Sequence, residues 1–351
     1  MKFKKYENNP ILTKNPKNYW EDLCVLNPAV IYKEDEGVAY MLYRAAGNDE
    51  EHYIYIGLAK SKDLIHFERC SDEPLIRPTL DGIDGGGVED PRLIKLGSYY
   101  YLTYASRPFA PGQYWREDKK VFGFKPEYGP KVLIYNDTIT HLAVSKDLVN
   151  WKKLGRITDS RMDDRDVILF PETINGKFWK ISRAMYKCGD GYENKNPAIW
   201  ISCSDDLLEW REEEKLLYYG HEDWEGKVGG STPPLKTDKG WLFFYHGVSP
   251  KDSGYRVGAM LLDLNDPTKI IGKTKDFLME PEAPYETGGF YNGCVFPTGL
   301  IEKDGEIYIY YGAGDQRICV AKINKDEFVD RNKVNLIGKC CGCDIVALAL
   351  E

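Results

Sequence analysis

The chain lacks any run of about 18 apolar residues, the length that a membrane-spanning helix requires. No apolar segment follows the basic residues among the first ten positions, so we expect neither a membrane span nor a secretory signal peptide. An excess of positive charge is missing too, because 47 Lys and Arg stand against 55 Asp and Glu, for a formal net charge of -8. Proteins that bind nucleic acid through its backbone need a basic face, so nucleic acid is not an expected partner.

The sequence also lacks the signs of a disulfide framework. Its nine cysteines are odd in number and scattered, mostly within apolar runs, as at Cys24, Cys203, Cys294 and Cys319. This usage favours reduced thiols and a cytoplasmic protein. The cluster of Cys340, Cys341 and Cys343 is an exception, but no second pair of ligands at a suitable spacing accompanies it, so we predict no metal site.

Long apolar patterns with the helical period of 3.6 residues are absent, and a β-type unit recurs five times instead. The unit consists of a short strand in which apolar and polar residues alternate, a polar turn, and an aromatic or apolar residue at its end. Its copies cover residues 58–67, 142–151, 201–210, 260–267 and 320–328. A hairpin with aromatic strands around a Gly-containing turn precedes each copy. Tyrosine-rich strands suit β packing, and aromatic rings can also stack on sugars.

These repeats predict an all-β fold, a five-bladed β-propeller in which each repeat supplies one four-stranded antiparallel sheet. We expect a single domain over residues 1–351, with blades that start near residues 27, 90, 166, 232 and 293. A pair of β-sandwiches does not explain five repeats. Residues 1–20 are expected to supply a strand that closes the ring. Residues 107–140 form a long insertion, whose aromatic residues favour an ordered flap over the mouth of the channel.

Positively charged residues gather at corresponding positions of the third and fourth blades. The innermost strand of a propeller blade begins at one mouth of the central channel, and the second strand returns to that mouth. The group there comprises Arg165, Arg183, Lys227 and His246. Arginine forks and a lysine charge are what a phosphate or carboxylate site requires. The alternative is that each cation pairs with a nearby carboxylate, for which Asp166, Glu172 and Asp223 are available.

An acidic candidate, Asp90, lies at the start of the second blade. Three successive glycines, Gly85–Gly87, precede it and would let the backbone approach a ligand closely. The segment is no phosphate-binding loop, because it lacks the Lys-Ser/Thr ending and no helical pattern follows. A carboxyl group near a ring of cations could act as a general acid. The alternative for Asp90 is an aspartate that caps a turn.

Several short motifs resemble glycoside hydrolase family 130, which comprises β-mannoside phosphorylases and related β-mannosidases on a five-bladed propeller. The resemblance spans residues 9–326 and rests on the order and blade positions of the motifs. They are Leu26–Pro28 (Leu-Asn-Pro), Leu42–Arg44 (Leu-Tyr-Arg), Val88–Arg92 (Val-Glu-Asp-Pro-Arg), Phe170–Pro171, Gly240–Val248 (Gly-Trp-Leu-Phe-Phe-Tyr-His-Gly-Val) and Tyr310–Asp315 (Tyr-Tyr-Gly-Ala-Gly-Asp).

The resemblance implies an inverting phosphorolysis that yields α-mannose 1-phosphate. It makes Asp90 the general acid, whose proton travels through a mannose hydroxyl. It also implies that Asn27, Arg44 and Asp315 hold the mannosyl ring, with Asp90, and that Arg165, Arg183, Lys227 and His246 hold phosphate. Phosphate takes the place of the second carboxylate of an ordinary inverting glycosidase. The expected partners are a small β-mannoside and phosphate, the latter as co-substrate, with no cofactor and no metal. A homo-oligomer is left open.

Linkage and reaction type leave alternatives open. The chain length and the insertion, with Tyr114 and Trp115 expected to shape the acceptor side, look most like the β-1,2-mannobiose phosphorylases. A β-1,4-mannoside phosphorylase is the next alternative, followed by a hydrolytic β-mannosidase and then a non-catalytic sugar-binding propeller. The retained basic cluster favours phosphorolysis over hydrolysis, and a lectin would need neither that cluster nor a buried acid.

Overall fold

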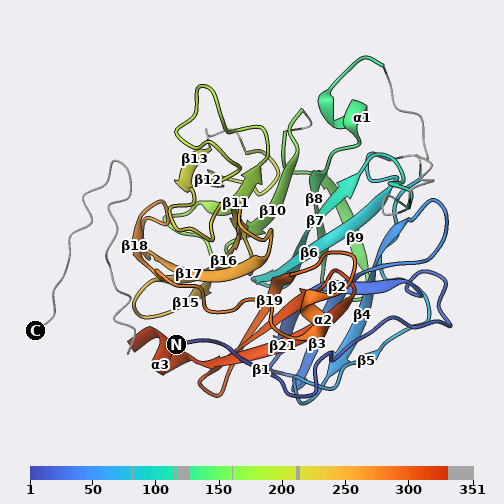
Figure 1. Cartoon of the computed structure of the whole chain (residues 1–351), viewed down its shortest axis with the longest axis horizontal. Coiled ribbons are helices and arrows are strands. Elements are labelled where there is room, and N and C mark those ends of the chain that lie inside the picture. The colour runs from blue at the N-terminus through green and yellow to red at the C-terminus, as the bar shows by residue number, and fades with distance from the viewer. Residues whose placement is uncertain (81, 114–115, 117–126, 160, 211–213, 331–351) are drawn as a thin grey trace, which may run out of the picture.

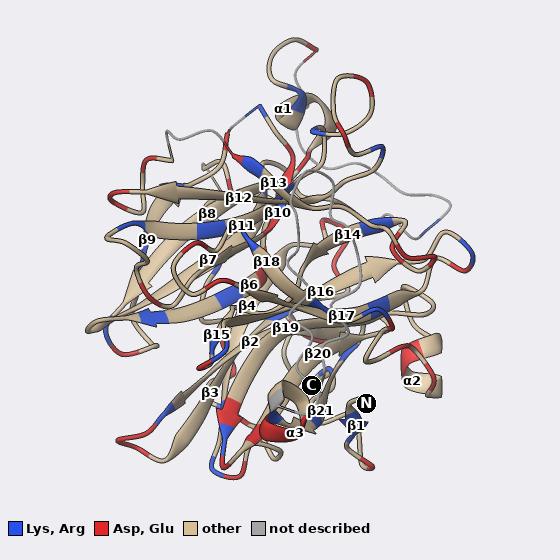
Figure 2. Cartoon of the chain, turned by 90° about the vertical axis from the view of Figure 1, so that its left-hand side faces the viewer, with Lys and Arg blue, Asp and Glu red and all other residues tan. Residues whose placement is uncertain are grey.

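The computed structural model describes residues 1–80, 82–113, 116, 127–159, 161–210 and 214–330 (Figure 1). Tyr114, Trp115 and the cluster of Cys340, Cys341 and Cys343 therefore lie outside the described residues. No helix in the described ranges is long and apolar enough to cross a membrane. Lys and Arg are interspersed with Asp and Glu along loops and strand ends (Figure 2).

The strands of the described chain form the blades of the expected five-bladed β-propeller, and neighbouring strands within a blade pair antiparallel (Figure 1). One parallel pair, Ile54 with Gly87, joins blades 1 and 2 into a single sheet. Blade 1 holds β2 (Cys24–Lys33), β3 (Val38–Ala46), β4 (Ile54–Ser61) and β5 (Glu68–Arg69). Blade 2 holds β6 (Gly87–Leu96), β7 (Tyr99–Arg107), β8 (Ile139–Ser145) and β9 (Trp151–Arg156). Blade 3 holds β10 (Asp164–Leu169), β11 (Phe178–Ala184), β12 (Ile199–Ser204) and β13 (Lys215–Tyr218).

The remaining two blades complete the ring. Blade 4 holds β14 (Lys227–Gly230), β15 (Leu235–Lys236), β16 (Trp241–Val248), β17 (Tyr255–Leu262) and β18 (Ile270–Lys273). Blade 5 holds β19 (Val295–Lys303), β20 (Glu306–Ala313) and β21 (Arg317–Asn324), with β1 (Lys4–Lys5) as its outer strand. The described helices are short: α1 (Lys131–Tyr135), α2 (Pro284–Thr287) and α3 (Lys325–Asp330). Among the first strands of the blades, β2 lies beside β6 and β19, and β10 lies beside β6 and β14.

The N-terminal arm closes the ring, as the sequence predicts. β1 pairs with β21 of the last blade, with Lys4 opposite Lys322 and Lys5 opposite Ala321. Lys5 Nζ also lies 2.8 Å from the fully buried carboxylate of Glu286. Strands that are far apart in the sequence therefore share the sheet of blade 5.

The repeated sequence unit is a repeated turn that follows the third strand of blades 1, 2 and 3. In each copy a Ser-x-Asp-Leu sequence uses its serine hydroxyl and aspartate carboxylate to accept backbone N–H groups. The leucine of each copy is buried with a left-handed backbone, at Leu64 (φ 70°), Leu148 (φ 67°) and Leu207 (φ 67°). The side-chain hydrogen bonds hold a conformation that leucine rarely adopts.

Candidate functional site

A cavity of about 420 Å³ opens where the first strands of the blades begin. Its lining is dominated by charged and aromatic side chains from several blades and from the 107–140 insertion. They include Asn27, Arg44, Glu89, Asp90, Arg107, Tyr135, Asn136, Arg165, Asp166, Arg183, Tyr255, Cys294, Phe296 and Asp315. Of the sequence-predicted site residues that the structure describes, Lys227 and His246 are not in this lining.

A β-bulge at the same place in three blades presents polar side chains at the centre. The pairing of the first with the second strand slips at Asn27 in β2, at Asp90 in β6 and at Asp166 in β10. All three residues have a left-handed backbone, with φ of 47°, 53° and 51°. Asn and Asp tolerate this region better than other side chains, and a bulge re-aims the side chain that it carries. In each of these three blades the bulge therefore directs one Asn or Asp side chain toward the cavity.

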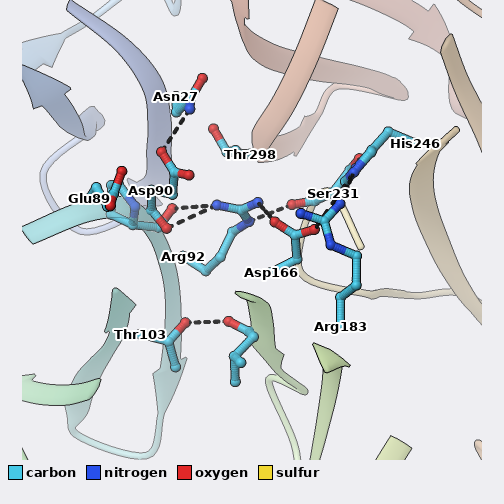
Figure 3. A network of polar contacts seen from close by, with 12 residues as sticks. Asn27, Glu89, Asp90, Arg92, Thr103, Asp166, Arg183, Ser231, His246 and Thr298 are labelled. Atoms are coloured by element: carbon cyan, nitrogen blue, oxygen red, sulfur yellow. Dashed lines mark hydrogen bonds and ion pairs between the residues drawn. The ribbon is translucent and has the colours of Figure 1, made fainter. Parts of the chain in front are cut away.

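The carboxylate of Asp90 is held by neighbours from blade 1. Asn27 Nδ2 donates a hydrogen bond of 2.7 Å to Asp90 Oδ1, and Arg44 Nη1 lies 3.0 Å from the same oxygen. Arg44 Nη1 also lies 2.9 Å from Glu89 Oε2, whose other oxygen lies 3.0 Å from Arg107 Nε. Asp90, Asn27 and Arg44, expected together on the mannosyl side, are thus brought into direct contact. Figure 3 shows the contact between Asn27 and Asp90.

The two carboxyl groups facing this part of the cavity differ in acidity. Burial raises the pKa of Asp90, but Arg44, the hydrogen bond from Asn27 and the charge of Arg92 together hold that pKa below its ordinary value. Burial raises the pKa of Asp315 above its ordinary value, aided by the charges of Asp90 and Glu89 and opposed by Arg44. Asp90 is therefore the more acidic of these two groups.

The cations of blades 3 and 4 are partly paired with carboxylates. Arg165 grips Asp163 with Nε and Nη2, each at 2.7 Å from a carboxylate oxygen, which leaves Nη1 outside this pair. Arg183 Nη1 lies 3.0 Å from Asp166 Oδ2. Both arginines thus pair with a carboxylate, Arg165 with Asp163 and Arg183 with Asp166, and their contact with phosphate stays a prediction. Glu172 and Asp223 are engaged elsewhere, with Lys236 and Lys251.

Lys227 lies within the electrostatic reach of both arginines and of Asp166. Burial, followed by the charge of Arg183, lowers the pKa of Lys227 to about 8, and the charge of Asp166 opposes the effect. A lysine whose charge is disfavoured by its surroundings gains when an anion arrives beside it. The site on this side therefore favours a negatively charged ligand.

His246 is buried and is held against Arg183. Burial first, and then Arg183 and Lys227, keep the pKa of His246 well below its usual value, so the ring is neutral. Its Nε2 lies 2.9 Å from Arg183 Nη1 and must accept that hydrogen bond, and its Nδ1 lies 3.3 Å from Ser231 Oγ. His246 therefore orients Arg183, and its expected contact with phosphate stays a prediction.

Gly229 has no side chain, and Asp166, Arg183 and His246 occupy the space beside it. A Cβ atom on Gly229 would lie 2.4 Å from Asp166 Oδ2 and 2.7 Å from both Arg183 Nη1 and His246 Cε1. No side chain fits there without displacing the group that orients Arg183.

The insertion contributes to the rim of the cavity. Asn136 connects the two ends of the insertion. Its side chain accepts a hydrogen bond of 2.9 Å from the backbone N–H of Phe109 and donates one of 2.8 Å to the Phe109 carbonyl. The carbonyl of Asn136 accepts a hydrogen bond of 2.9 Å from Arg107 Nη1. Tyr135, at the end of α1, lines the cavity with 62% of its surface exposed. The expected acceptor contacts of Tyr114 and Trp115 lie outside the described residues and stay predictions.

The comparisons with known proteins identify the family of the chain. The sequence profile of the glycoside hydrolase family 130, described as beta-1,4-mannooligosaccharide phosphorylase, matches residues 3–333. The chain belongs to glycoside hydrolase family 130. A 1,2-beta-oligomannan phosphorylase of Thermoanaerobacter sp. (strain X514) is 35% identical over 327 residues, which cover 92% of this chain and 97% of the relative.

Two further relatives are similar over almost their whole length. A beta-1,2-mannobiose phosphorylase, also of Thermoanaerobacter sp. (strain X514), is 33% identical over 332 residues, covering 91% of this chain and 96% of the relative. The solved structure of the beta-1,2-mannobiose phosphorylase from Listeria innocua, in complex with beta-1,2-mannobiose, superposes with a TM-score of 0.75 at 26% identity. That match covers 93% of this chain and 98% of the other.

Sequence reasoning missed several residues of this family 130 site. Arg92 ends the Val88–Arg92 motif, and its guanidinium lies between Asp90 and Asp166, a placement that the sequence does not indicate (Figure 3). Tyr255 stacks on His246 with ring centroids 5.4 Å apart and meets Phe296 edge-on at 5.8 Å. The sequence offers one sign of such residues, a polar or aromatic side chain near the start of a blade. Many residues share this sign, and only the closed ring of blades shows which of these side chains meet at the site.

Metal ligands do not gather in the described part of the chain. Within those residues no three His, Cys, Asp or Glu side chains are placed so that they could hold a metal ion. Independence from metals and cofactors stays a prediction.

Proposed function

We propose that the protein is an inverting β-mannoside phosphorylase that acts on the non-reducing end of β-1,2-mannobiose or β-1,2-mannooligosaccharides. A phosphate oxygen forms a bond to the anomeric carbon, and the bond from that carbon to the glycosidic oxygen breaks. The departing oxygen gains a proton that originates at Asp90 and passes through a mannose hydroxyl. The products are α-D-mannose 1-phosphate and the shortened sugar.

The observation that carries this proposal is that Asp90 lines the same cavity as the two cations Arg165 and Arg183. Asp90 is set by Asn27 and Arg44 from blade 1, whereas the arginines and Lys227 come from blades 3 and 4. An ordinary inverting glycosidase places a second carboxylate there to activate water. Cations at that place would instead bind the attacking phosphate and compensate its charge.

The roles follow from this division. Asn27, Arg44 and Asp315 are assigned to the mannosyl ring, because they surround Asp90 at the blade starts. Phosphate is assigned to Arg165 through its outer guanidinium nitrogen, to Arg183 and to Lys227. Their charges oppose the repulsion between a phosphate dianion and the carboxylates of the cavity. His246 is assigned to holding Arg183 in place.

The linkage rests on similarity. Both Thermoanaerobacter relatives are named for β-1,2-linked substrates, and each is matched over more than 95% of its length. A second candidate, a β-1,4-mannoside phosphorylase, is favoured by the description of the family profile. A cytoplasmic setting is supported by the described cysteines, which are all free thiols.

A linkage panel tests the proposal. The purified protein is incubated with β-1,2-mannobiose, β-1,4-mannobiose and β-1,4-mannosyl-glucose, each with and without inorganic phosphate, and mannose 1-phosphate is quantified. We expect phosphate-dependent product from β-1,2-mannobiose at a rate at least tenfold above the others. Preferred cleavage of a β-1,4 substrate would favour the second candidate. Release of mannose without phosphate would contradict phosphorolysis.

A further inference from the structure

Arg92 occupies the centre of the propeller beneath the cavity, and neither the mannosyl nor the phosphate assignment includes it. Its residue exposure is 2%, and its guanidinium lies between Asp90 on one side and Asp166 with Arg183 on the other (Figure 3). A buried guanidinium is costly unless its donors are satisfied. The contacts of the Arg92 guanidinium therefore indicate the role of this residue.

The donors of Arg92 reach residues of three blades. Nη1 donates to the backbone carbonyl of Asp90 at 3.0 Å and to that of Pro91 at 3.3 Å, which are the residues of the bulge in β6. Nε donates to the carbonyl of Ser231 at 2.6 Å in blade 4. Nη2 lies 3.8 Å from Asp166 Oδ1 in blade 3. The guanidinium also lies over the ring of Phe296, at 5.4 Å from its centroid.

Asp166 connects this arrangement to the phosphate side. The same carboxylate lies 3.0 Å from Arg183 Nη1 and 3.6 Å from His246 Nε2. Arg92 thus fixes the backbone that carries the acid and shares Asp166 with the arginine assigned to phosphate. Asp90 and Asp166 are bulge residues of neighbouring blades, so one guanidinium bridges two equivalent positions of the ring.

We propose that Arg92 is a positioning residue that ties the placement of Asp90 to the placement of Arg183, so that the acid and the phosphate site keep one relative geometry. This inference rests on the proposed function for its meaning in catalysis. Arginine suits the position because its planar fork donates hydrogen bonds through Nε and Nη1 to carbonyls of two blades and points Nη2 toward the Asp166 carboxylate of a third, at 3.8 Å. A lysine keeps the charge but cannot reach all of these acceptors at once.

Two variants separate positioning from charge. Arg92→Lys retains the positive charge and loses the fork, and Arg92→Gln loses the charge as well. Tyr310→Phe is the matched structural control, because it removes a buried hydrogen bond of 2.9 Å from Tyr310 to the Leu64 carbonyl, between blades 5 and 1 and outside the cavity. For each protein we would measure thermal unfolding, phosphate binding by calorimetry, and kcat and KM over pH.

We expect Arg92→Lys to lower kcat about 100-fold, since a displacement near 1 Å costs about that factor. It should raise KM for phosphate about tenfold, a factor equivalent to about 1.4 kcal/mol. Tyr310→Phe should lower the unfolding temperature and leave both kinetic constants within about twofold of the wild type, as an isolated loss of one hydrogen bond predicts.

The pH profile distinguishes the two Arg92 variants. The charged groups that face Asp90 are Arg44, Arg92, Glu89 and Asp315. Removing the Arg92 charge raises the pKa of Asp90, so the acid form persists to higher pH. The falling limb of the profile should therefore move to higher pH in Arg92→Gln and much less in Arg92→Lys.

A second variant keeps the inference testable if Arg92→Gln does not fold. Asp166→Asn interrupts the link from the phosphate end without changing Arg92, and we expect it to lower kcat as well as phosphate affinity. An Arg92→Lys protein with wild-type kcat and phosphate affinity would overturn the inference, as would an Asp166→Asn protein with weakened phosphate binding and wild-type kcat. Calorimetry needs no turnover, so a wild type that binds phosphate but cleaves no mannoside would contradict the proposed function alone.

Discussion

Asp90 shows how one side chain is prepared by its backbone and by its neighbours. Its left-handed bulge conformation aims the carboxylate into the cavity, and Asn27 and Arg44 contact the same oxygen. These contacts favour the ionised form, although a general acid must carry a proton. A phosphate anion bound in the same cavity opposes that ionisation, so the acid is expected to gain its proton as phosphate binds.

The first prediction concerns Asp90→Asn, an isosteric change that removes the transferable proton. We expect turnover to fall by about 10²–10⁴-fold, the contribution of general acid catalysis. Phosphate binding should be as tight as in the wild type or tighter, because a negative charge has left the cavity. Initial rates and calorimetry measure the two effects. Near-normal phosphorolysis by the variant would remove Asp90 from the role.

The second prediction concerns the charge of Lys227. Its pKa of about 8 lies below the ordinary value of 10.5, so the ammonium is present below that pH and is lost above it. The affinity of the free enzyme for phosphate should therefore fall as pH rises through about 8. Lys227→Met should raise KM for phosphate about ten- to a hundredfold, the factor for a charge-assisted hydrogen bond of about 1.5–3 kcal/mol, and should remove that pH dependence.

Lys251→Met is the matched control for this measurement. Lys251 is 71% exposed and pairs with Asp223, so its loss should leave KM for phosphate unchanged. An unchanged KM in Lys227→Met would show that this lysine is structural.

At the scale of the elements, the bulges and the close approach of β14 to β11 build the site. β14 carries Gly229 opposite His246 of β16, and Asp166 and Arg183 of blade 3 fill the space beside it. The third prediction is that Gly229→Ala displaces Arg183 and Asp166 and weakens phosphate binding at least tenfold. Its stability should be compared with that of Gly258→Ala, which meets Tyr245 at 2.6 Å inside blade 4.

Gly258→Ala should lower the unfolding temperature and leave phosphate affinity within about threefold of the wild type, because its clash lies in the apolar core. If Gly229→Ala and Gly258→Ala lost phosphate affinity equally, the loss would reflect general destabilisation of blade 4.

The insertion between β7 and β8 supplies the fourth prediction. Tyr135 lines the cavity on α1, and an aromatic ring at a sugar site contributes about 0.5–1.5 kcal/mol beyond its buried area. Tyr135→Ala should therefore raise KM for the mannoside several-fold and leave phosphate affinity alone. Tyr128→Ala is the control from the same insertion, since Tyr128 is 86% exposed and is not in the cavity lining. Equal effects of the two variants would contradict an acceptor contact at Tyr135.

At the scale of the whole molecule, the ring brings together residues that are far apart in sequence. Asn27 and Asp90 are joined by a hydrogen bond, and Thr298 Oγ1 donates to the Pro28 carbonyl at 2.9 Å across blades 5 and 1. The Ser-x-Asp-Leu repeat and the Gly-containing hairpins were enough to predict the propeller, because turn chemistry and strand alternation are local. The N-terminal closing strand followed from the same reasoning.

The site could be predicted from the sequence less completely than the fold. Its candidate residues could be chosen because blade starts recur, and the structure gathers Asn27, Arg44, Asp90 and Asp315 around one cavity. The pairing of Arg165 with Asp163, the neutral state of His246 and the central place of Arg92 could not be predicted. Each depends on burial and on contacts between blades, which a linear pattern does not specify.

The central claim is that phosphate, and not water, accepts the mannosyl group. The most direct test is the product stoichiometry from β-1,2-mannobiose in phosphate buffer, followed by phosphorus and proton NMR. We predict one free mannose and one α-mannose 1-phosphate for each disaccharide consumed, with an equal loss of inorganic phosphate. Two free mannose molecules for each disaccharide, with phosphate unconsumed, would contradict the claim.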